Sequence, residues 1–320
     1  MISALLALVG AFVYGAADFL GGLAAKRLRS IVVTAVAAAS GLVALLLALP
    51  LLGGQWTAVD ALWGMLAGAF GVAAVGLLYA CLAIGPMSIL SPLTAVVSAI
   101  APMLWGLLIN GETLAPLGYL GLGVALVAVI LVGFIPGEKV VRPSVRGLVM
   151  AAGAGLAIGG LLIVLDQTSD ASGMIPLVTS RAASVVITAV IVTTLVVMAA
   201  RRGIPASSVF DPAGSALGAT PTGHADLEHT ALPAPSATTT FTRTRALWLA
   251  ILCGVLDAAA NAIILIALRI GELSIVSALT ALYPAGTILL AAIVLRERVA
   301  AIQWVGLVLA LTAGGMLALA

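Results

Sequence analysis

Charged residues are scarce in this chain. Asp, Glu, Lys and Arg make up 8% of its 320 residues, while hydrophobic residues make up 63%. Soluble proteins carry about 25% charged residues, so this composition excludes a soluble domain and requires lipid as the solvent. The formal net charge of +2 is too small to indicate a nucleic-acid partner, and the basic residues lie at the ends of apolar segments rather than in a patch.

Cysteine and histidine, which supply many metal sites and nucleophilic centres, occur only twice each. Cys81 and Cys253 fall inside apolar runs, where a free cysteine behaves as a small hydrophobic residue. Both histidines stand in the run Gly-His-Ala-Asp-Leu-Glu-His of residues 223–229, which we interpret as a solvated polar patch in preference to a metal site. A Gly-rich phosphate-binding loop is also missing. We therefore expect no cofactor, no metal and no enzymatic activity.

Long apolar runs dominate the rest of the sequence. A bilayer core of about 30 Å needs about 20 apolar residues per helix, and an open sheet would leave backbone groups unsatisfied in lipid. The first run has no basic region before it, which favours a retained span over a cleaved signal peptide. The fold class predicted is all-α integral membrane, with ten transmembrane helices at 2–24, 31–52, 62–84, 88–109, 116–135, 147–166, 175–200, 246–268, 273–295 and 302–320.

Residues 201–245 differ from these runs. The segment is rich in Pro, Ser, Thr, Ala and Gly and has no apolar periodicity. Such a composition is typical of disorder. We predict a disordered loop between the seventh and eighth helices.

One stretch of sequence occurs twice. Residues 85–95 and 271–281 share Gly, Ser, Ile, Ser, Leu, Thr and Ala at matching positions. Internal similarity of this kind indicates a duplicated unit. Because five helices per copy is an odd number, the second copy crosses the membrane in the opposite sense, which is the inverted-repeat architecture of secondary transporters. The expected five-helix repeats are 1–136 and 146–320.

The similarity between the copies continues into a short motif. Glu112 is followed by Gly121, and Glu297 by Gly306, in each case at the start of the last helix of a copy. Together with the ten spans, the two five-helix copies and the first-helix pair Tyr14-Gly15, these residues make the chain similar to the EamA-type branch of the drug/metabolite transporter superfamily. The resemblance covers the chain except 201–245. It implies a transporter and leaves the substrate open.

The charge bias of the loops predicts an orientation. Of the 14 Lys and Arg residues, all but Arg181 and Arg269 follow odd-numbered helices. The positive-inside rule then predicts both termini outside, whereas EamA-type transporters usually have both termini in the cytoplasm.

Few polar side chains lie inside the spans, and a charge there indicates function by default. Asp257 lies halfway along the eighth helix, with Asn261 on the same helix face. Asp18 lies in the first helix, one turn after Tyr14. The functional hypothesis is that Asp18 and Asp257 line a central cavity and bind a cationic or zwitterionic substrate, or carry a proton. The alternative is a hydrogen bond to a neighbouring helix.

Small polar residues accompany the prolines of the fourth and ninth helices. Proline frees a carbonyl group in the preceding turn, and such helices often line transporter cavities. The pairs Ser91/Thr94 and Ser277/Thr280 occupy equivalent places in the two copies. They could face one site across the pseudo-twofold axis that relates the copies, or could form hydrogen bonds to neighbouring helices. The aromatic residues Tyr283 and Trp105 could offer a stacking surface for a solute. Trp105 could equally anchor its helix at the membrane interface.

Three further charged residues have structural interpretations. We expect Arg181 to pair with Asp166 or Asp170 at the membrane edge. We expect Glu112 and Glu297 to be structural, because a carboxylate near a helix N-terminus is favoured by the helix dipole.

These observations favour a secondary transporter over two alternatives. It would move a small amino-acid-like or weakly basic solute across the plasma or inner membrane by alternating access, with a homodimer possible. A lipid-modifying membrane enzyme would need a nucleophile or metal cluster. A non-transporting membrane scaffold would tolerate replacement of both aspartates. The few charges inside the spans argue against a highly charged substrate.

Overall fold

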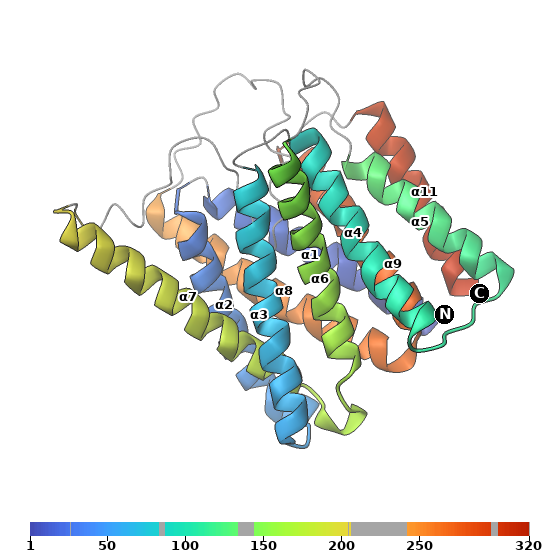
Figure 1. Ribbon diagram of the computed structural model, residues 1–320, viewed down its shortest axis with the longest axis horizontal. Helices are drawn as coiled ribbons and strands as arrows, with labels where there is room; N and C mark the ends of the chain where they lie inside the picture. The colour runs from blue at the N-terminus through green and yellow to red at the C-terminus, as the bar shows by residue number, and fades with distance from the viewer. Residues whose placement is uncertain are drawn as a thin grey trace.

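A computed structural model describes residues 1–25, 27–82, 87–133, 144–203, 205, 242–295 and 300–319. Throughout these residues the regular structure is helical (Figure 1). Most of the predicted 201–245 loop, including the histidine-containing run, lies outside the described residues, as does Glu297. The helices are α1 (Ile2–Ala25), α2 (Ser30–Leu52), α3 (Ala58–Leu82), α4 (Met87–Leu108), α5 (Pro116–Gly133), α6 (Val145–Asp166), η1 (Asp170–Ser172), α7 (Ile175–Arg201), α8 (Arg243–Ile270), α9 (Leu273–Thr280), α10 (Tyr283–Leu290), η3 (Ala291–Leu295) and α11 (Ala301–Leu319).

The helices are long and apolar enough for a bilayer. In the described part of the chain, nine helical segments meet the length and composition of a membrane span, and α4 contributes a shorter apolar stretch, Leu93–Leu108. Large apolar side chains also cover the outside of the bundle, among them Leu47, Leu66 and Val190. The predicted class, an all-α multi-pass membrane protein, is confirmed.

The predicted ninth span is one crossing made of three helical pieces. Helix α9 ends at Thr280, α10 begins at Tyr283, and η3 completes the segment as a π-helical turn. Pro284 explains the first break, because its ring nitrogen has no hydrogen to donate to the carbonyl group one turn earlier. Helix α4 contains Pro92 and Pro102 and stays continuous. The equivalent helices of the two predicted copies therefore differ.

Helices from the two halves interlock. Helix α1 packs along α8, and α3 packs along α6. Helix α2 contacts α8 as α3 contacts α7, and α1 contacts α10 as α4 contacts α6. If each helix is replaced by the one five membrane crossings away in the chain, the first contact of each pair becomes the second. Two interlocked copies are expected to show this pattern. The inverted repeat itself stays a prediction.

Helices α5 and α11 lie side by side at one edge of the bundle (Figure 1). A Cβ atom at Gly121 of α5 would lie 2.9 Å from Leu317 of α11, and one at Gly306 of α11 would lie 2.7 Å from the backbone nitrogen of Val132 in α5. Both motif glycines thus allow the same two helices to approach closely.

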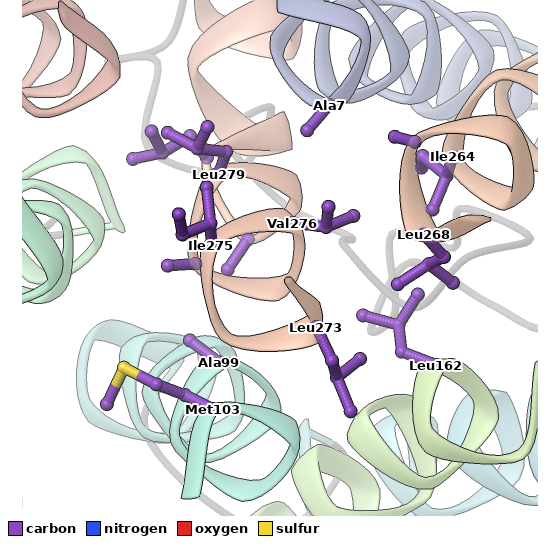
Figure 2. Packing of buried hydrophobic residues seen from close by; sticks show 14 of the residues in the cluster. Ala7, Ala99, Met103, Leu162, Ile264, Leu268, Leu273, Ile275, Val276 and Leu279 are labelled. Carbon is purple, nitrogen blue, oxygen red and sulfur yellow. The ribbon is translucent and has the colours of Figure 1, made fainter. Parts of the chain in front are cut away.

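The core is centred on α9, all of whose residues are buried. Figure 2 shows its apolar side chains surrounded by neighbours from α1, α4, α6 and α8. They are Leu273, Ile275, Val276 and Leu279 of α9 with Ala7, Ala99, Met103, Leu162, Ile264 and Leu268 around them. The short helix therefore sits where the two halves meet.

Candidate functional site

A cavity of about 130 Å³ lies between the two halves, at mid-height in most of the helices. Its lining comes from α1, α2, α3 and α4 of the first half and from α6, α7, α8, α9 and the start of α10 of the second. The polar side chains around it are Tyr14, Thr34, Ser98, Ser180, Arg181, Ser184, Asp257, Asn261, Ser277, Thr280 and Tyr283.

An ion pair dominates the electrostatics of the cavity. The Nη2 atom of Arg181 on α7 contacts the Oδ2 atom of Asp257 on α8. Their side chains are 17% and 7% exposed, so both charges are largely removed from solvent. A buried charge is costly unless it is paired, and the pair here neutralises both members. The cavity therefore presents one positive and one negative group side by side.

The sequence prediction assigned Arg181 a different partner. We expected Asp166 or Asp170, but those carboxylates lie near the end of α6. Asp166 accepts a hydrogen bond from the Nδ2 atom of Asn110 at 3.0 Å, and Asp170 lies 3.9 Å from Arg269. Arg181 is more than one turn inside α7, which brings it level with the middle of α8. The expectation was wrong, although an arginine inside an apolar helix was itself a signal of function.

A hydrogen bond joins the first helix to the eighth beside the ion pair. The Tyr14 hydroxyl group donates to the Oδ1 atom of Asn261 at 2.6 Å. The Nδ2 atom of Asn261 donates in turn to the backbone carbonyl of Asp257, one turn earlier, at 2.8 Å. Both side chains are thereby oriented where they border the cavity.

The broken ninth span adds further polar groups. Ser277 and Thr280 line the cavity from α9, and Tyr283 lines it from the first residue of α10. Ser277 donates to the carbonyl of Ser274 at 3.1 Å, whereas the Thr280 hydroxyl has no hydrogen-bond partner among the described residues. That oxygen atom is itself buried, so Thr280 borders the cavity without exposing its hydroxyl group to it.

Other predicted site residues lie elsewhere. Thr94 donates to the carbonyls of Leu90 and Ala151, each at 3.0 Å, so it bonds α4 to α6 as the alternative interpretation held. Trp105 is 37% exposed on the outer surface and does not border the cavity. The side chain of Ser91 is outside the described part of the chain.

Asp18 was expected in the cavity and is not part of its lining. It is fully buried in α1, one turn beyond Tyr14, where α1 packs against α8 and α10. Asp18 shares a helix face with Tyr14 but lies one turn further along α1, beyond the part of that helix that borders the cavity.

A layer of polar contacts closes one end of the bundle. Glu112, in the α4–α5 turn, accepts hydrogen bonds from the backbone nitrogens of Leu273 at 2.7 Å and Ser274 at 3.0 Å. We expected Glu112 beside the N-terminus of the helix that follows it, but the helix N-terminus it bonds is that of α9, in the other half of the chain. In the same layer Asp60 accepts from the backbone nitrogen of Ser169 at 2.8 Å.

The apolar core separates this layer from the cavity. Between the cavity residues and the polar turns, buried apolar side chains lie in α6, α7 and α8 and just before α7: Leu165, Leu177, Leu265, Leu268 and Met174. The cavity is therefore sealed toward the end of the bundle that contains the polar layer.

Comparisons with known proteins agree with this arrangement. The model of the EamA-like transporter family matches residues 230–318. In solved structures, 29 chains are similar to this one. One of them, described as the crystal structure of a protein, is 14% identical in sequence and has a TM-score of 0.68. The alignment covers 99% of this chain and 98% of that chain. At that identity the likeness establishes the fold alone. No curated protein sequence matches.

These findings define the class of protein. The match over residues 230–318 confirms the predicted resemblance to EamA-like transporters, and the described helices are those of an all-α multi-pass membrane protein.

Proposed function

We propose that the chain is a secondary transporter for a small zwitterionic, amino-acid-like solute, and that it works by alternating access between two inverted five-helix halves in the plasma or inner membrane. The observation that supports this proposal most strongly is the Arg181–Asp257 ion pair at the wall of the central cavity.

The ion pair matches the charges of such a solute. A carboxylate group pairs well with the fork of an arginine side chain, and an ammonium group pairs with a carboxylate. A zwitterion entering the cavity exchanges the internal pair for two external pairs and leaves no buried charge unpaired. A solute of net charge would leave one member uncompensated, at a cost that a buried site makes large.

Another part of the cavity wall is apolar and gives room for a small side chain. It is formed by residues such as Ala67, Gly71, Val72 and Val75 of α3 and Leu161 of α6. The apolar wall and the charged pair together favour a solute with a charged head and a compact apolar body.

Gly71 is expected to limit the size of that body. A Cβ atom there would meet only Leu161, at 3.5 Å, which is an ordinary contact. We therefore expect Gly71→Val to fold, to project its methyl groups into the cavity, and to lower the flux of larger zwitterions more than that of smaller ones. Uptake of a series of amino acids of increasing size by the variant and by Gly76→Val tests this, because Gly76 lies outside the cavity and a Cβ atom there meets nothing within 4 Å. An equal loss for all solutes would contradict the assignment.

Alternating access also requires the sealed end of the bundle to open. The carboxylate of Glu112 holds the N-terminus of α9, and its two charge-assisted hydrogen bonds cross between the halves. Such bonds contribute about 1.5–3 kcal/mol each when one partner is charged. We infer that Glu112 stabilises the closed state of this end.

Glu112→Gln is expected to lower the thermal stability of the purified protein. The matched control is Glu272→Gln, which removes the same charge at the start of α9 from an exposed side chain that forms no capping bond. The pKa of the Glu272 carboxyl is raised, first by partial burial and then by the charges of Glu112 and Asp166, so its neutralisation relieves repulsion. Equal melting temperatures for the two variants would show that Glu112 has no such role.

Uptake into proteoliposomes tests the proposed function. The purified chain is reconstituted and exposed to a panel of amino acids, amines, sugars and sugar phosphates. The proposal predicts saturable flux of one or more zwitterions. Saturable flux of a sugar phosphate would overturn the substrate class, and the absence of any flux would favour a non-transporting scaffold.

A further inference from the structure

A second carboxylate in the bundle has an unusual environment. The side chain of Asp18 is completely buried, and neither of its oxygen atoms has a hydrogen-bond partner among the described residues. Asp60 is a useful contrast. It is also buried, but its carboxylate accepts hydrogen bonds from the Thr57 hydroxyl and from the backbone nitrogen and hydroxyl of Ser169.

The two environments favour different protonation states. An ionised carboxylate buried without a partner is very unfavourable, so such a group takes up a proton instead. A carboxylate that accepts several hydrogen bonds is stabilised in its charged form. The surroundings of Asp18 therefore suit a neutral carboxylic acid, and those of Asp60 suit a carboxylate.

In the described part of the chain, the titratable and charged groups that face Asp18 do not supply a cation. They are Tyr14 on its own helix and Asp257 and Cys253 on α8. The Tyr14 hydroxyl group is directed to Asn261, and the guanidinium group of Arg181 is paired with Asp257. Helices α2, α9 and α11 contain no titratable side chains, and α10 contains only Tyr283.

We propose that Asp18 is the proton-binding site of the transporter, separate from the solute site at Arg181 and Asp257. It holds a proton in the conformation described here and releases it to water when α1 moves away from α8 and α10. The proposal rests on the proposed function, because it assigns the coupling ion of the same transport cycle.

The packing of α1 explains how the two sites communicate. Asp18 lies one turn beyond Tyr14, which borders the cavity and bonds Asn261 on α8. Helix α1 belongs to the first predicted half, whereas α8 and α10 belong to the second. Any rocking of one half against the other thus changes the surroundings of Asp18 and the shape of the solute site together. A group that is neutral when enclosed and ionised when hydrated then links proton release to this movement.

Infrared difference spectroscopy tests the protonation state without any solute. The full chain is purified at neutral pH in an alkyl maltoside detergent, which has no ester carbonyl group to overlap the carboxylic acid band. The C=O stretch of a protonated carboxylic acid should be present in the wild type, absent from Asp18→Asn and retained in Asp60→Asn. A band that persists in Asp18→Asn would overturn the proposal. Should that variant fold poorly, the wild type with ¹³C-labelled aspartate serves instead: the band must shift with the label, and an unshifted band would overturn the proposal.

Transport measurements then test the coupling. A zwitterion moved by the wild type should accumulate in response to an imposed pH gradient, and Asp18→Asn should lose that response while Asp60→Asn keeps it. Flux in the wild type that ignores the pH gradient would overturn the proton site alone. The absence of flux for every zwitterion would instead refute the proposed function, and the coupling with it.

Discussion

Asp257→Asn is expected to weaken the binding of a zwitterionic solute on the order of 100-fold, because truncating one member of a buried charge pair costs about 2–5 kcal/mol. The variant removes the negative group that would pair with the ammonium group of the solute. It also leaves the guanidinium of Arg181 facing the cavity without its partner. Flux at low solute concentration should fall accordingly.

The variant is best measured beside two others. Asp166→Asn is the matched control, since it removes a carboxylate from the end of α6, outside the cavity. The double variant Asp257→Asn with Arg181→Gln removes both charges, so it should fold at least as well as either single variant and still fail to transport. Normal flux in Asp257→Asn would show that Asp257 is a packing residue and that the site lies elsewhere.

Gly15→Ala is expected to lower the stability of the bundle strongly. An added Cβ atom would lie 2.5 Å from the carbonyl oxygen of Tyr283, 2.6 Å from the nitrogen of Thr287 and 2.8 Å from the Cα atom of Gly286. These are backbone atoms, so no side-chain rotation can relieve the overlap. Helix α1 must move away from α10, and the hydrogen bond from Thr287 to the Gly15 carbonyl, now 3.1 Å, is lost.

The cost of this overpacking is about 1–3 kcal/mol or more, and the melting temperature in detergent measures it. Gly76→Ala is the control, because Gly76 lies in a helix interior with nothing within 4 Å of a Cβ atom. That substitution should stabilise the helix slightly, by about 0.5–1 kcal/mol. Similar melting temperatures for the two variants would contradict the close packing of α1 on α10.

The membrane spans could be predicted because the signal is strong and local. A run of apolar residues long enough to cross a bilayer has few alternatives, and charges or glycines mark its ends. Residues 273–295 show the limit of that signal. Pro284 breaks the helix there, while Pro92 and Pro102 leave α4 continuous. Composition alone does not decide which proline is accommodated, since the outcome depends on the helices packed around it.

The site could be predicted only for residues that are unusual in their own helix. Asp257, Asn261 and Tyr14 stood out as polar groups in apolar runs, and they border the cavity. Partners across helices were harder to foresee. The pairing of Arg181 with Asp257 and of Glu112 with α9 depends on the rotation of each helix about its axis and on its position along the membrane normal. The sequence of a single helix contains no information on either.

The most direct test of the central claim is a competition experiment with matched solutes. Flux of a zwitterionic amino acid is measured in the presence of the same amino acid, of the amine that lacks its carboxylate, and of the acid that lacks its ammonium group. If the Arg181–Asp257 pair binds both charges, the zwitterion competes strongly and the two singly charged analogues compete weakly. Equal competition by the amine and the zwitterion would contradict the account, because the carboxylate, and with it Arg181, would then contribute nothing to recognition.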